Sequence, residues 1–133
     1  MKTAEKRLAR WLAVTGAVYA AGAIDFTARP RAATRSLNQA GGSPLPDEEP
    51  GLYNALASAY MATIAAVALA ASRAPADNRN LIPPLLVAKA TSSAGFLLRY
   101  ATTRRRGYAL SAALDALLFG VTAGLAASVD ESR

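Results

Sequence analysis

The chain contains neither cysteine nor histidine, and these absences remove most familiar reaction centres. Without cysteine there are no disulfides and no thiolate nucleophiles. Without histidine there is no imidazole base, no histidine-ligated haem and no Cys/His zinc site within this chain. The remaining candidates for chemistry are Asp, Lys, Ser and Tyr side chains, and they form no recognisable catalytic motif. We therefore expect no enzymatic activity, no cofactor and no metal site.

Hydrophobic residues are abundant instead, and they are concentrated in blocks. They make up 53% of the 133 residues, and the mean hydropathy is positive at +0.18 although 18% of the residues are charged. Each block is about as long as the roughly 20 residues needed to cross a bilayer core. The blocks cover residues 8–28, 52–72, 81–100 and 108–129. The sequence thus predicts an all-α integral membrane protein, a bundle of four transmembrane helices that forms a single domain over residues 1–133.

Two other interpretations of these blocks stay open. The first block follows a basic head and contains small residues in a permissible cleavage pattern, which is also typical of a secretory signal peptide. A soluble helical bundle would need polar outer faces, for which the blocks have few charges. Between the first two blocks, the many prolines and glycines of residues 29–51 predict an irregular loop, with a short amphipathic turn over residues 32–37.

Two charged residues, Lys89 and Asp115, lie in the middle of the third and fourth blocks. A charge at that depth costs several kcal/mol unless it is paired or hydrated, so it indicates an internal ion pair or a functional site. Counted from the short 101–107 connection, the two residues differ in depth by roughly 7 Å at 1.5 Å per residue. A lysine side chain spans that difference, so we expect Lys89 to pair with Asp115. By the same count Asp25 and Arg99 are expected at similar shallow depths on one membrane side, where they are a second candidate pair.

Small residues recur at every fourth position of the fourth block, at Ala112, Ala116, Gly120, Gly124 and Ser128. Small residues let transmembrane helices approach closely, so this stripe predicts a helix-packing face. The triple arginine Arg104, Arg105 and Arg106 connects the last two blocks, and we expect it to contact lipid head groups. Basic residues throughout the chain flank apolar blocks, so the net charge of +6 indicates anionic lipid rather than nucleic acid as the partner.

Lys and Arg residues outside the blocks or near their ends are balanced, with seven on each side of the predicted membrane, so they indicate no orientation. This layout resembles that of the dual-topology small multidrug transporters and small fluoride channels, which assemble as antiparallel dimers. The small multidrug family centres its chemistry on a glutamate in the first helix, whereas the first block here has only Asp25 near its end. The resemblance is one of layout, and it does not assign the chain to either family.

Three functions fit these features. The first is a structural or accessory subunit that packs in a larger membrane complex or homo-oligomer, which explains the small-residue stripe and the lack of catalytic groups. The second is a small transporter or channel with Lys89 and Asp115 as its ion-responsive centre. The third is a protein that binds lipid or another hydrophobic ligand along a face lined by Tyr19, Tyr53 and Tyr60. We expect the first function, in a bacterial inner (cytoplasmic) membrane. The bacterial origin is inferred because Arg outnumbers Lys twelve to three and Ala fills a quarter of the chain, as GC-rich coding produces.

Overall fold

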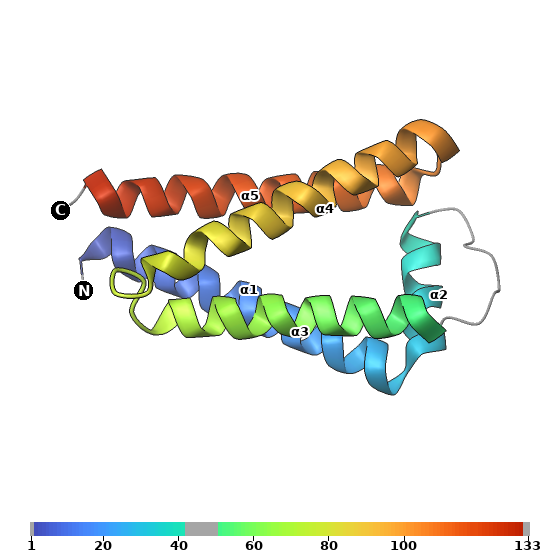
Figure 1. The fold of residues 1–133 in the computed structure, drawn as a ribbon, viewed down its shortest axis with the longest axis horizontal. Helices are drawn as coiled ribbons and strands as arrows, with labels where there is room; N and C mark the ends of the chain where they lie inside the picture. Colours follow the sequence, from blue (N-terminus) through green and yellow to red (C-terminus); the bar gives the residue numbers. More distant parts are fainter. Residues whose placement is uncertain (1, 42–50, 132–133) are drawn as a thin grey trace.

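The computed structural model describes residues 2–41 and 51–131, and the described chain is almost entirely helical (Figure 1). Its helices are α1 (Thr3–Ala28), α2 (Pro30–Gly41), α3 (Gly51–Arg73), α4 (Ile82–Thr103) and α5 (Arg106–Glu131), with a 3₁₀ turn, η1 (Arg79–Leu81), before α4. Four of them, α1, α3, α4 and α5, are long and apolar enough to cross a membrane. The predicted all-α bundle of four such helices is confirmed.

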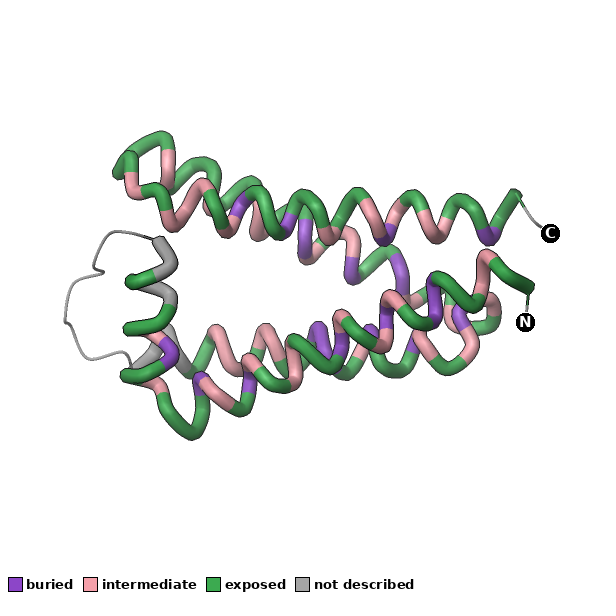
Figure 2. The backbone as a smooth tube through the Cα atoms, turned by 180° about the vertical axis from the view of Figure 1, so that it is seen from behind, coloured by how far each residue is buried: buried purple, intermediate pink, exposed green. Residues whose placement is uncertain are grey.

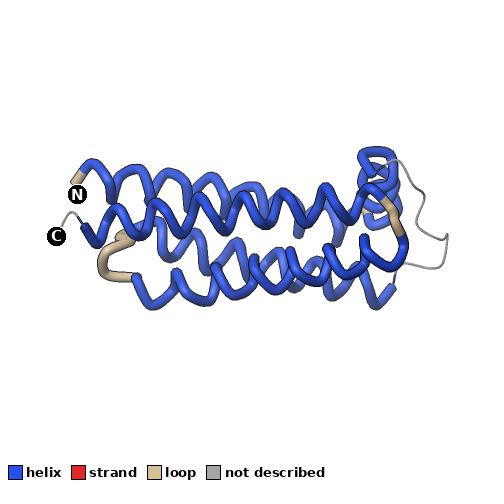
Figure 3. The backbone as a smooth tube through the Cα atoms, turned by 90° about the horizontal axis from the view of Figure 1, so that it is seen from above, coloured by secondary structure: helices blue, strands red, loops and turns tan. Residues whose placement is uncertain are grey.

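The four long helices are arranged as two pairs. α1 packs along α3 and α4 packs along α5, while the contacts between the pairs are fewer and run mainly from α1 to α5. The two ends of the described chain lie at the same end of the bundle, and α2 lies across the opposite end, in contact with α1 and α5 (Figures 1 and 3). The bundle therefore has a terminal end and an α2 end.

The helix boundaries follow from local sequence. α4 has Pro83 and Pro84 in its first turn, where a missing N–H costs nothing. It ends at Arg104, which adopts a left-handed conformation with φ of 56° and donates its backbone N–H to the Tyr100 carbonyl over 2.7 Å. A left-handed residue satisfies the last carbonyls and reverses the chain into α5 within two residues.

The expected irregular loop over residues 29–51 is wrong in its first part, because Pro30–Gly41 forms helix α2. Pro30 opens this helix, and the other prolines of the segment all follow Gly41, so nothing within residues 31–40 breaks a helix. Gly51, the last residue of the predicted loop, begins α3, and residues 42–50 lie outside the described residues.

Ala23, Phe26 and Ala33 are buried toward the α2 end, but the cluster of buried apolar residues that forms the core lies in the terminal half of the bundle (Figure 2). Its buried members come from all four long helices: Leu8, Leu12, Ile64, Ala68, Ala71, Ile82, Leu85 and Val129. Toward the α2 end, by contrast, no residue of α4 after Lys89 and none of α5 before Ala112 is buried, and both helices are described throughout. The two helix pairs are thus held tightly at one end and separate toward the other. Large apolar side chains such as Val18, Val87 and Leu98 are exposed, as the outer surface of a membrane bundle requires.

Candidate functional site

Lys89 and Asp115 meet where the apolar core ends and the two helix pairs begin to separate. Lys89 is only 4% exposed and Asp115 7%. The Lys89 Nζ lies 3.1 Å from Asp115 Oδ1, which makes this the one ion pair of the described residues with both side chains buried. The structure therefore joins the two residues that the sequence had suggested as partners. A lysine side chain is long enough to bridge the roughly 7 Å difference in depth expected from the residue count.

The pair belongs to a larger polar cluster, which we call the polar centre: Tyr19, Tyr60, Lys89, Ser92 and Asp115. Lys89 donates to the Tyr19 hydroxyl as well as to Asp115, and Tyr19 in turn donates to Asp115 Oδ1 over 3.2 Å. Ser92 donates to Asp115 Oδ2, so both carboxylate oxygens accept hydrogen bonds. Every oxygen of the buried carboxylate thus has a partner within the chain, which is what a buried charge requires.

Aromatic rings complete the polar centre. The Lys89 ammonium lies 4.0 Å from the ring centroid of Tyr19 and 5.1 Å from that of Tyr60, within the range of cation–π attraction. The Tyr60 hydroxyl lies 3.2 Å from the Ala88 carbonyl oxygen and 3.3 Å from Ser92 Oγ. Both tyrosine hydroxyls thus have partners inside the chain, and the side chain of Tyr53 lies outside the described ones. All four long helices contribute to the centre: α1, α3, α4 and α5.

Two further polar contacts tie the helices together, one on each side of the centre. Ser93 Oγ donates to the Ala112 carbonyl over 2.9 Å and joins α4 to α5. Trp11 Nε1 donates to Thr122 Oγ1 over 2.9 Å and joins α1 to α5. Sequence reasoning overlooked Trp11. The signal in the sequence was a tryptophan within an apolar block, because a buried indole N–H usually has a hydrogen-bond acceptor.

The second candidate pair does not form. Asp25 instead forms an ion pair with Arg29, four residues further along the chain, while the Arg99 side chain is exposed. α1 and α4 are not among the helices that pack closely together, and no residue of α4 after Lys89 is buried. Arg29 is only four residues from Asp25 in the sequence, so its side chain reaches the carboxylate without a close approach of two helices.

The small-residue stripe of α5 is split between the inside and the outside of the bundle. Ala112 is 1% exposed, whereas Ala116, Gly120, Gly124 and Ser128 are all exposed. A Cβ atom built on Gly120 or Gly124 would have no neighbour within 4 Å. Most of the stripe therefore plays no part in packing this chain against itself.

The triple arginine lies at the α2 end, where α4 turns into α5. Arg104 and Arg106 are exposed, and the Arg104 guanidinium lies 6.0 Å from the ring of Tyr100, the last aromatic residue of α4. This position at the end of two apolar helices is where basic side chains meet head groups if the bundle crosses a bilayer.

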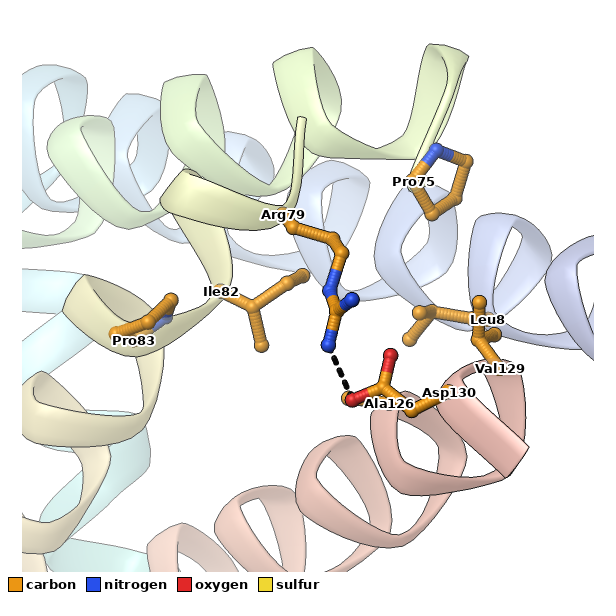
Figure 4. A pocket seen from close by; sticks show the side chains of 8 residues that line it. All are labelled: Leu8, Pro75, Arg79, Ile82, Pro83, Ala126, Val129 and Asp130. Carbon is orange, nitrogen blue, oxygen red and sulfur yellow. Dashed lines mark ion pairs between the residues drawn. The ribbon is translucent and has the colours of Figure 1, made fainter. Parts of the chain in front are cut away.

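A small cavity of about 200 Å³ lies at the terminal end of the bundle (Figure 4). Its walls are mainly apolar, and Arg79 and Asp130 form an ion pair across it that links η1 to the end of α5. Both side chains are about half exposed, at 48% and 44%. The two charges neutralise each other. The cavity is therefore a gap in the apolar core that the ion pair covers.

No protein-family model matches this chain, and neither a curated protein nor a solved structure is similar to it. The fold and the contacts described above are therefore the basis for assigning a function. They fit a small membrane protein with one buried, internally satisfied polar centre.

Proposed function

We propose that this chain is a structural subunit of a membrane assembly, which associates with a further transmembrane helix through the outward face of α5. One observation supports the proposal. Some glycines are needed for close helix packing within the fold, and others are not. A Cβ on Gly16 would lie 2.6 Å from Leu69 Cγ, and one on Gly22 would lie 2.9 Å from Met61 Sδ. These glycines let α1 approach α3. Gly120 and Gly124 have no such neighbour.

Glycine inside a helix costs roughly 0.5–1 kcal/mol relative to alanine, so two glycines on one face are a disadvantage for a free helix. In a bilayer, helices gain nothing from hiding apolar surface and associate instead through close packing, for which small residues are needed. A second helix packed on Gly120 and Gly124 would offset their cost. The exposed Ala116 and Ser128 extend the same stripe by one turn at each end.

A second copy of the chain is the partner that this face fits best. Two-fold association places the same patch of both copies in contact, so one flat stripe of small residues is sufficient for both sides. A helix of another membrane polypeptide is the other partner that a structural subunit would have.

The test is the mass of the protein in nanodiscs, for the wild type and for Gly120→Leu/Gly124→Leu. Gly95→Leu is the matched control, because a Cβ on Gly95 also has no neighbour within 4 Å but lies on α4. We expect the wild type and the control to be dimeric or bound to another polypeptide, and the α5 variant to be monomeric with unchanged helix content. A monomeric wild type without any bound polypeptide contradicts the proposal.

The polar centre has a structural role in this proposal. It joins α1, α3, α4 and α5 at the depth where the apolar core ends, and its two charges are paired with each other. We expect Lys89→Ala and Asp115→Ala to lower the abundance of the assembled protein to a similar extent, since each leaves the other charge buried without its partner.

Transport is the second candidate, and the convergence of polar side chains from all four long helices favours it. In that case Asp115 is the group that responds to the ion. Asp115→Asn would then leave the mass and helix content unchanged and abolish ion flux into proteoliposomes. If the polar centre is structural instead, Asp115→Asn lowers the stability of the protein, and the wild type shows no ion flux.

We further propose a bacterial inner membrane as the location and membrane lipids as constant partners. Arg104, Arg105 and Arg106 would contact head groups at the α2 end. α2 would lie along the same membrane surface, with Arg31 and Arg35 exposed one helical turn apart.

A further inference from the structure

A shallow apolar groove runs between α1 and α3 on the half of the bundle near α2. Its volume is about 450 Å³, and it is lined by Ala23, Ile24, Thr27, Ala28, Ser58, Ala59 and Ala62. The groove exists because both helices present small residues here, while Ile24, which is 68% exposed, forms a rim. The Thr27 hydroxyl donates to the Ala23 carbonyl over 2.8 Å, so it adds no open polar group to the wall.

Basic residues of the chain follow directly on one end of this groove. Ala28 is the last groove residue of α1, and the chain turns at Arg29 directly into α2. Arg31 is exposed in the first turn of α2, and Arg35 is exposed one turn later. The N-terminus of α2 also favours an anion through its helix dipole. Arg29 is partly neutralised by Asp25, which leaves Arg31 and Arg35 as the main source of charge.

We propose that the groove and this corner together bind one phospholipid with an anionic head group. One acyl chain would lie between α1 and α3, and the phosphate would lie against Arg31 and the start of α2. The combination of an apolar groove with charge at one end matches an amphiphile at the membrane surface, whereas a peptide would need polar partners along its length. The inference rests on the proposed insertion of the bundle in a membrane, but not on its association through α5.

The charges supply the selectivity of such a site. An acyl chain leaving the bilayer for the groove exchanges one apolar environment for another and gains little. An arginine near the surface attracts an anionic lipid by about 1 kcal/mol, which corresponds to a preference of roughly fivefold for each arginine.

The experiment compares phosphatidylglycerol with phosphatidylcholine in nanodiscs that contain both, and counts the lipids that the protein retains in native mass spectrometry. We expect the wild type to retain one phosphatidylglycerol preferentially. Arg31→Gln/Arg35→Gln should reduce that preference by at least fivefold. Its control is Arg10→Gln/Arg73→Gln, which removes two arginines from the terminal end and should leave the preference unchanged.

A second variant tests the groove independently of charge. Ala59→Phe fills it, and Ala66→Phe places the same ring on an exposed position of α3 outside it. Only the first should reduce lipid retention. Equal retention of the two lipids by the wild type, or equal losses in a variant and its control, overturns the inference. Failure to recover the protein in nanodiscs at all would instead contradict membrane insertion.

Discussion

Removing the charge of Lys89 alone is expected to destabilise the bundle more than removing the whole ion pair. Lys89→Met keeps the length of the side chain but leaves the Asp115 carboxylate, 7% exposed, with hydroxyl donors only. Breaking a buried ion pair from one side costs about 3–5 kcal/mol, whereas replacing both charges by apolar residues is close to neutral or stabilising. We therefore expect Lys89→Met to lose about 3–5 kcal/mol of unfolding free energy. Lys89→Met/Asp115→Leu should stay near the wild type.

Trp11 provides the assay, because it is the only tryptophan and its indole N–H bonds Thr122 across the α1–α5 contact. Its fluorescence during unfolding by SDS reports when α1 leaves α5. Arg79→Met is the control, since the Arg79–Asp130 pair is about half exposed and such pairs contribute about 0–1 kcal/mol. The reasoning is refuted if Lys89→Met is no less stable than the Arg79→Met control. It is also refuted if the double variant is as unstable as the single one.

Three substitutions test the packing more locally, by the same unfolding measurement. Gly16→Ala places a Cβ 2.6 Å from Leu69 Cγ and 3.2 Å from the Ala65 carbonyl oxygen, so it should cost about 1–3 kcal/mol; a neutral result would mean that α1 and α3 are not in close contact. Gly95→Ala meets nothing within 4 Å and should stabilise α4 by roughly 0.5–1 kcal/mol; a loss would reveal a contact on that face. Arg104→Gly relieves the left-handed conformation at φ 56° and should gain about 1 kcal/mol, whereas a loss would mean that the arginine side chain outweighs the strain.

The four long helices were predictable because each is a long apolar block with few charged residues, and composition alone distinguishes such blocks from loops. The positions of Lys89 and Asp115 also predicted their contact, since an isolated charge in an apolar block usually faces the interior of the bundle and is paired there. Only a short amphipathic turn over residues 32–37 was foreseen of helix α2, because the prolines of residues 29–51 were weighed together although those after Pro30 all follow Gly41.

Contacts that depend on how far the helix pairs separate were beyond the sequence. Matching depths suggested Asp25 and Arg99 as partners, but depth carries no information on lateral distance, and Arg29 was nearer to Asp25. The division of the α5 stripe into buried Ala112 and exposed Gly120 and Gly124 has the same origin. A periodic pattern identifies a face of a helix, while only the packing of the other helices decides whether that face is covered.

Photo-crosslinking in the membrane of expressing cells tests the central proposal most directly. A photoreactive residue at Leu117 lies on the same face of α5 as Gly120 and Gly124, and one at Val87 on α4 serves as the control; both positions are exposed, at 59% and 64%. The account predicts a discrete covalent adduct with a second copy or another polypeptide from Leu117, and no discrete protein adduct from Val87. No adduct at Leu117, or the same diffuse background at both positions, would contradict it.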